Sequence, residues 1–87
     1  MWRVEISDTA ARQLAKLGKA EAARITAFLR ERITGAENPR ATGKALTGPL
    51  GGLWRYRVGD YRVICDLQDA VLRVLVLRVG HRGDVYR

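Results

Sequence analysis

Three arginines flank a predicted tight turn in the second half of the 87-residue chain. The segments on either side of Gly59-Asp60 are rich in β-branched and aromatic residues, and this dipeptide is typical of a two-residue hairpin loop. In that register Arg57 lies directly opposite Arg62, and Arg55 shares their face of the ribbon. Like charges placed opposite each other are destabilising, so this grouping predicts a bound anion such as phosphate. The alternative is that each side chain extends separately into solvent.

The segment after the last predicted strand adds residue types that can act on a nucleic acid. His81 is the only histidine of the chain, and an imidazole titrates close enough to neutral pH to carry a proton. Arg82 follows it, and Tyr86 lies nearby, where an aromatic ring beside arginines can stack on a base. The structural alternatives are a surface histidine and a tyrosine that packs on the sheet.

The residues needed for several other kinds of chemistry are missing from the sequence. One cysteine and one histidine cannot form a Cys/His zinc site or a disulfide framework. No carboxylate pair, Ser-His-Asp set or phosphate-binding glycine loop is recognisable. Cys65 has the alternation parity of Tyr61 and Val63, so we expect it in the core and not as a nucleophile. No metal and no organic cofactor are therefore expected.

Positive charge is concentrated in the second half of the chain. The whole sequence has 16 Lys and Arg against 9 Asp and Glu, for a net charge of +7. Residues 38–87 contain nine of the cations and four of the carboxylates, which is +5, and eight of those nine cations are arginine. Arginine presents a planar fork suited to phosphate. This bias favours an anionic partner such as nucleic acid, with a solvated basic surface as the alternative.

Length and hydropathy indicate one globular domain, residues 1–87. With 47% hydrophobic residues the chain can bury a core. Its longest apolar run, residues 74–77, is far too short to cross a bilayer, and the charged residues Arg3 and Glu5 argue against a signal peptide. We expect a cytoplasmic protein that does not bind membranes.

The first half of the chain is predicted to form a strand and two helices. Residues 2–6 alternate apolar and charged side chains, which is typical of a half-buried strand. Ser7 then provides an N-cap for a helix that ends at Gly18. A second helix is expected over residues 19–34, because its apolar residues form one stripe and Gly35 follows. The short break between the helices predicts an antiparallel helical hairpin.

The second half is predicted to be a long loop followed by a three-stranded antiparallel meander. Residues 35–52 lack periodicity and contain five glycines and two prolines, so we expect a loop there. Strands are expected at residues 53–58, 61–67 and 70–79, the last of them central because nearly all its residues are apolar. The predicted fold is α+β, with both helices packed on one face of the sheet.

These segments together resemble the RelE/ParE superfamily, the toxin halves of bacterial type II toxin–antitoxin pairs. The resemblance covers almost the whole chain and is carried by Lys44-Ala-Leu-Thr-Gly, Leu53-Trp-Arg-Tyr-Arg-Val-Gly-Asp-Tyr-Arg-Val and Val79-Gly-His-Arg-Gly-Asp-Val-Tyr. The family fold, a small sheet against two N-terminal helices, agrees with the elements expected above. The C-terminal segment favours the RelE-like branch, whose members cleave mRNA in the ribosomal A site and are silenced by an antitoxin.

The resemblance also implies roles for individual residues in RNA cleavage. RNA supplies its own nucleophile, the 2′-hydroxyl, and the products are a 2′,3′-cyclic phosphate and a 5′-hydroxyl. The implied catalytic residues are Arg57, Arg62, His81, Arg82 and Tyr86, and the implied RNA-binding residues are Lys44 and Arg55. The family has lysine where this chain has arginine at positions 55 and 57. A guanidinium has a pKa above 12 and cannot serve as a base at neutral pH, so His81 is the expected proton carrier.

Two other functions stay open at this point. ParE-like relatives poison DNA gyrase and usually lack the full arginine and tyrosine set. An RNA-binding relative without turnover is the third possibility, because arginine replaces lysine here. In each case we expect a cognate, RelB-like antitoxin whose acidic segment folds on binding to the basic face.

Overall fold

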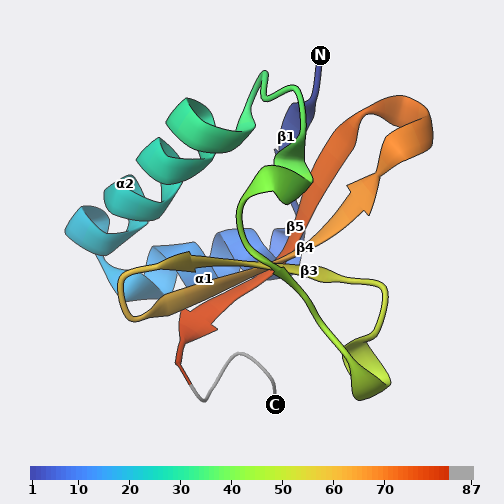
Figure 1. Cartoon of the computed structure of the whole chain (residues 1–87). Helices are drawn as coiled ribbons and strands as arrows, with labels where there is room; N and C mark the ends of the chain where they lie inside the picture. Colours follow the sequence, from blue (N-terminus) through green and yellow to red (C-terminus); the bar gives the residue numbers. More distant parts are fainter. Residues whose placement is uncertain (83–87) are drawn as a thin grey trace.

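In the computed structural model, which describes residues 1–82, two helices pack on one face of a five-stranded sheet (Figure 1). The elements are β1 (Arg3–Ile6), α1 (Asp8–Leu17), α2 (Lys19–Phe28), β2 (Lys44–Ala45), β3 (Trp54–Val58), β4 (Tyr61–Gln68) and β5 (Arg73–His81). The strand order is β1-β5-β4-β3-β2, with β1 parallel to β5 and every other neighbouring pair antiparallel. The predicted α+β class, helical hairpin and meander are confirmed, and β5 is central as expected.

The first helix begins and ends at the residues that the sequence predicts. The Ser7 hydroxyl accepts a hydrogen bond from the Ala10 N–H at 3.1 Å, and Asp8 adds a negative charge at the helix N-terminus. Gly18 separates α1 from α2 with φ of +90°, a conformation that glycine adopts without strain. Within residues 1–82, no helix is both long and apolar enough to cross a membrane.

The second helix is shorter than the predicted span of residues 19–34. α2 ends at Phe28, and Leu29–Ile33 form one turn of π-helix in which the Thr34 N–H donates to the Leu29 carbonyl at 2.8 Å. This wider turn keeps both Leu29 and Ile33 buried in the core, while the residues between them are exposed. A π-turn is not visible in an apolar stripe, which explains the difference.

The predicted loop of residues 35–52 contains a short strand that the sequence did not reveal. β2 pairs with the start of β3 through Lys44 opposite Arg55 and Ala45 opposite Trp54. Trp54 Nε1 donates to the Thr42 carbonyl at 2.8 Å and holds the loop against β3. The loop is therefore attached to the sheet along the edge of β3.

β5 contains an irregularity that changes which of its residues share a face. Ile64 pairs with Arg78 but the next residue, Cys65, pairs with Val76, so Leu77 is an extra residue in β5. The last strand runs over residues 73–81, two to three residues later than predicted, because residues 69–72 form the turn that precedes it. The bulge at Leu77 therefore determines which face of the sheet the following residues of β5 lie on.

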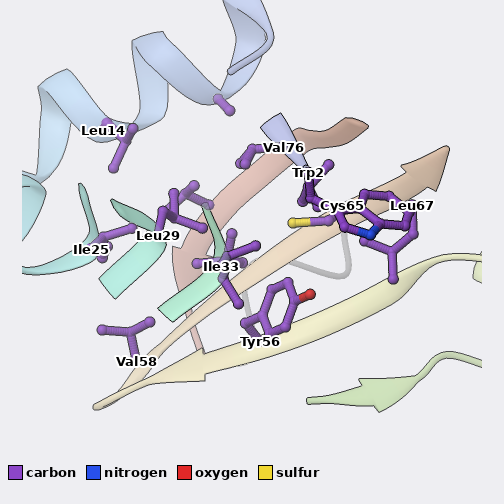
Figure 2. Close-up of a cluster of buried hydrophobic side chains, with 14 residues drawn as sticks. Trp2, Leu14, Ile25, Leu29, Ile33, Tyr56, Val58, Cys65, Leu67 and Val76 are labelled. Carbon is purple, nitrogen blue, oxygen red and sulfur yellow. The ribbon is translucent and has the colours of Figure 1, made fainter. Parts of the chain in front are cut away.

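The hydrophobic core lies between the helices and the inner face of the sheet. Figure 2 shows side chains from α1, α2 and the π-turn meeting side chains of the strands in one cluster. Tyr56 is fully buried there, with its ring centroid 5.8 Å from that of Phe28. The Tyr56 hydroxyl donates to the Pro39 carbonyl at 2.6 Å, so the core also fixes the long loop. Burial raises the pKa of the Cys65 thiol to about 12, which agrees with its expected place in the core.

Candidate functional site

The hairpin between β3 and β4 has the register that the sequence predicts. Gly59 and Asp60 form the loop, with Gly59 at φ of +60°, and Val58 pairs with Tyr61. Tyr56 and Val58 consequently face the core. Their neighbours in β3, Arg55 and Arg57, face away from the helices because alternate residues of a strand point to opposite faces.

The face of the sheet opposite the helices carries a group of basic side chains. Arg57 is paired with Arg62, and Arg55 is paired with Lys44 on its other side. Residues directly opposite each other in an antiparallel pair share a face, with Cβ atoms roughly 4.5–5.5 Å apart. The register therefore brings together four of the residues expected to contact RNA.

Arg78 joins this face because of the bulge in β5. Arg78 lies five positions after Arg73 in the sequence, so regular alternation would place the two side chains on opposite faces. The extra residue at Leu77 restores the same parity, and Arg78 is paired with Ile64, which is paired in turn with Arg55. We refer to Lys44, Arg55, Arg57, Arg62 and Arg78 as the arginine face. Arg78 was not among the residues expected from the sequence, because nothing in the sequence marks the bulge.

Arg62 is the most buried cation of the arginine face. Only 9% of its surface is exposed, and its Nη1 donates to the carbonyls of Tyr61 at 3.3 Å and Gly59 at 3.5 Å. Within residues 1–82, no carboxylate lies within salt-bridge distance of Arg62 or Arg57. A guanidinium removed from water favours a charged partner, so this position suits a bound anion.

The three C-terminal site residues are not all placed on the arginine face. His81 is paired with Tyr61, and their rings make an edge contact with centroids 5.7 Å apart. By this pairing His81 shares the parity of Tyr61 and not that of Arg62. The Arg82 N–H donates to the Asp60 carbonyl at 2.9 Å, which ties the end of β5 to the hairpin loop. Tyr86 lies outside the described residues.

The chemistry available to this site is that of cations and an imidazole. In the part of the chain from Met1 to Arg82, no three His, Cys, Asp or Glu side chains are grouped so that they could hold a metal ion. The arginine face can bind phosphate and stabilise charge that develops on its oxygens. Fold and face together define a small α+β protein whose sheet carries a cluster of guanidinium groups suited to an anionic ligand.

Comparison with known proteins identifies the family. Over residues 4–86 the sequence matches the family described as "ParE toxin of type II toxin-antitoxin system, parDE". The chain is 36% identical to Toxin RelE and 34% identical to Toxin RelG, both of Mycobacterium tuberculosis. Each alignment spans 86 residues and covers 99% of this chain, with 87% of Toxin RelE and 97% of Toxin RelG. The chain therefore belongs to the ParE toxin family, within the RelE/ParE superfamily of type II toxin–antitoxin toxins.

Solved structures agree with this assignment. The toxin–antitoxin complex RelBE2 from M. tuberculosis contains a chain with a TM-score of 0.84 and 32% identity, covering 93% of this chain and 98% of that one. The archaeal RelE–RelB complex from Pyrococcus horikoshii gives a TM-score of 0.71 and 31% identity, covering 97% and 98%. The isolated RelE toxin of E. coli, at 18% identity, TM-score 0.72 and coverage of 95% and 86%, shares the fold.

Proposed function

We propose that this toxin is a metal-independent endoribonuclease that cleaves mRNA on the ribosome and so inhibits translation. The observation that carries this proposal is the arginine face, in which Arg57 lies opposite Arg62 and no described carboxylate neutralises either one. Two like charges in register are destabilising unless an anion lies between them. The similarity to two proteins named as RelE and RelG toxins supports the RelE-like branch.

The reaction uses the RNA's own 2′-hydroxyl as the nucleophile. Its oxygen attacks the adjacent phosphorus as its proton leaves, the bond from phosphorus to the 5′-oxygen breaks, and that oxygen takes up a proton. The products are a 2′,3′-cyclic phosphate and a 5′-hydroxyl. Arg57, Arg62 and Arg82 stabilise the charge that builds on the phosphoryl oxygens, usually the largest contribution in such sites. Lys44 and Arg55 bind flanking phosphates, a contact that weakens with salt.

Proton transfer requires a group other than arginine, and His81 is our candidate. His81 is exposed at the end of β5, so its ring can leave Tyr61 and turn toward bound RNA. A positioned general base or acid contributes typically 10²–10⁴-fold to the rate. Tyr86 would orient a base or assist the proton transfer.

The decisive experiment measures mRNA cleavage on ribosomes by the Arg62→Ala and Arg82→Ala variants. We expect each to reduce kcat by at least about 100-fold, the usual effect of removing one group that stabilises developing charge. Arg12→Ala, an exposed cation on α1, is the matched control, and circular dichroism checks that every variant is folded. Normal cleavage by both site variants would refute the mechanism. Full activity of His81→Gln would leave Tyr86 or water as the proton carrier.

A gyrase-directed toxin is the second candidate, because the matching family is described by its ParE members. Supercoiling by gyrase, measured with the same purified sample, discriminates between the two targets. Inhibited supercoiling without mRNA cleavage would replace the ribonuclease proposal. Salt-sensitive RNA binding with neither effect would indicate a relative that has lost turnover.

An antitoxin is the protein partner that we propose for either activity. The solved relatives include the RelBE2 complex and the archaeal RelE–RelB complex. An acidic segment that folds on binding is complementary to the net charge of +7. The cytoplasm, where mRNA and ribosomes are found, is the proposed location.

A further inference from the structure

A groove lies between the open edge of β3 and the end of the helical layer. β2 pairs only with Trp54 and Arg55, so the remainder of β3 has no strand on that side. The hollow there has a volume of about 320 Å³. Its lining residues are Phe28, Arg32, Thr42, Gly43, Lys44, Arg55, Tyr56 and Arg57.

A second, more open hollow continues this groove toward the hairpin loop. It shares Phe28, Arg32 and Arg57 with the first hollow and reaches Arg24 and Gly59. The Arg24 guanidinium lies over the loop, because a Cβ atom added at Gly59 would be only 2.6 Å from its Nη2. We call the two hollows together the edge groove.

The lining of the edge groove is strongly cationic. Its cations are Arg24, Arg32, Lys44, Arg55 and Arg57, and its one carboxylate is Glu31. Arg24 and Arg32 come from the helical layer, whereas the other three belong to the arginine face. The groove and the arginine face are therefore continuous around the edge of β3.

Phe28 gives the edge groove an aromatic surface between these cations. The ring is half-buried, lines both hollows and is supported by Tyr56 at a centroid distance of 5.8 Å. Cations that follow a backbone, combined with an aromatic ring on which a base stacks, are how proteins bind single-stranded nucleic acid. A nucleic-acid base stacks face to face on such a ring, whereas an acidic side chain does not.

We infer that the edge groove binds the single-stranded RNA that extends beyond the cleaved phosphate. The strand leaves the arginine face past Arg57, places a base on Phe28 and a phosphate on Arg32, and ends near Arg24. This inference rests on the proposed function, since it names the path of the same substrate. It assigns RNA binding to helix-layer residues that lie on the other side of the β3 edge from the proposed chemistry.

The test compares Arg32→Ala with Arg30→Ala. Both arginines are exposed in the same π-turn, but Arg30 lines neither hollow. The probes are fluorescent 2′-O-methyl RNA oligonucleotides, which cannot be cleaved, in a short form that covers the arginine face and a longer form that also reaches the groove. Fluorescence anisotropy gives the Kd of each at several salt concentrations.

We expect Arg32→Ala to weaken binding of the longer RNA several-fold and to leave binding of the short RNA unchanged. For this variant, the slope of the logarithm of the association constant against the logarithm of salt concentration should be shallower by about 0.7. That is the value for one phosphate contact with a single strand. Phe28→Leu, which keeps an apolar side chain but removes the ring, should also weaken only the longer RNA. Arg30→Ala should match the unmodified protein.

The outcomes separate this inference from the proposed function. Identical behaviour of Arg32→Ala and Arg30→Ala, while Arg62→Ala loses cleavage, overturns the groove as an RNA site and keeps the ribonuclease. Absence of mRNA cleavage by the unmodified toxin overturns the proposed function itself, whereas normal cleavage by both Arg62→Ala and Arg82→Ala refutes only the proposed mechanism. If Arg32→Ala weakens binding of an acidic antitoxin peptide and does not affect RNA, the groove is a peptide site and our inference is wrong.

Discussion

At the scale of single residues, Tyr56 connects the core to the loop beside the site. Its hydroxyl is buried and donates to the Pro39 carbonyl, and its ring supports Phe28. Burial, reinforced by the nearby Cys65 thiol, raises the pKa of Tyr56 above its ordinary value. The neutral phenol is therefore the form that the folded protein requires.

We predict that Tyr56→Phe lowers the free energy of unfolding by about 1 kcal/mol, the net worth of one hydrogen bond. A phenol whose pKa is raised by folding contributes stability that is complete below its unfolded pKa of about 10 and is lost as the pH rises above it. Removing the hydroxyl should consequently reduce the loss of stability at alkaline pH. The loss that remains comes from the Cys65 thiol, whose pKa is also raised by burial. Urea unfolding from neutral pH to pH about 11 measures both effects, and an unchanged alkaline profile would contradict the assignment.

Individual site residues differ in how far the sequence could place them. Arg55, Arg57 and Arg62 were placed correctly because Gly59-Asp60 determines the loop and strand alternation determines the face. Arg78 was missed because its face depends on the bulge at Leu77. The burial of Arg62 was also unpredictable, since it depends on how the side chain folds back on the loop.

At the scale of elements, α1 takes the place of a strand beside the end of β5. β1 pairs with β5 only as far as Val76, and the Ser7 N–H donates to the Val76 carbonyl. Beyond that point the Ser7 hydroxyl donates to the Leu77 carbonyl at 3.2 Å, and the Val79 N–H donates to Gln13 Oε1 at 2.7 Å. Side chains of the α1 region thus satisfy the backbone of the strand that leads to His81.

We predict that Gln13→Ala loosens the end of β5. The Val79 amide should exchange its hydrogen faster, and the free energy of unfolding should fall by about 1–3 kcal/mol for an unsatisfied buried donor. Because Gln13 acts through β5, we also expect a lower kcat with little change in KM. Hydrogen exchange followed by NMR and ribosome cleavage kinetics test this, with Arg12→Ala as the neighbouring control. Unchanged Val79 exchange would show that the hydrogen bond is unimportant.

The elements themselves were predictable where the signal is local. The N-cap at Ser7, the break at Gly18 and the hairpin loop each depend on residues adjacent in sequence. β2 and the π-turn were not predicted, because a two-residue strand forms only through its partner β3, and a π-turn leaves the apolar spacing almost unchanged. The pairing of β1 with β5 was not predicted either, because the two strands are far apart in the sequence and become neighbours only in the folded sheet.

At the scale of the whole molecule, the net charge of +7 attracts a polyanion to the toxin. Most of the cations are exposed, so their attraction acts over about one Debye length and is screened by salt. Association should depend on ionic strength more than the chemical step does, since that step takes place after the RNA is bound. The same screening weakens each phosphate contact.

We predict that raising the ionic strength at constant magnesium lowers kcat/KM for mRNA cleavage about 10-fold or more, with a much smaller effect on kcat. Initial rates at limiting and saturating ribosome concentrations give the two quantities. An equal effect of salt on both would mean that the arginine face does not act mainly through association.

Because β1 pairs with β5, the sheet of the toxin cannot be completed until β5 has been synthesised. Ribosomes produce β5 after every other described strand, yet β5 lies between β1 and β4 and holds both in the sheet. Until that segment emerges, β1 has no neighbour and the bulge that places Arg78 does not exist. Contacts between segments so far apart in sequence also form slowly. A ribosome that makes this protein therefore synthesises β5 before the molecule gains the complete surface proposed to attack ribosome-bound mRNA.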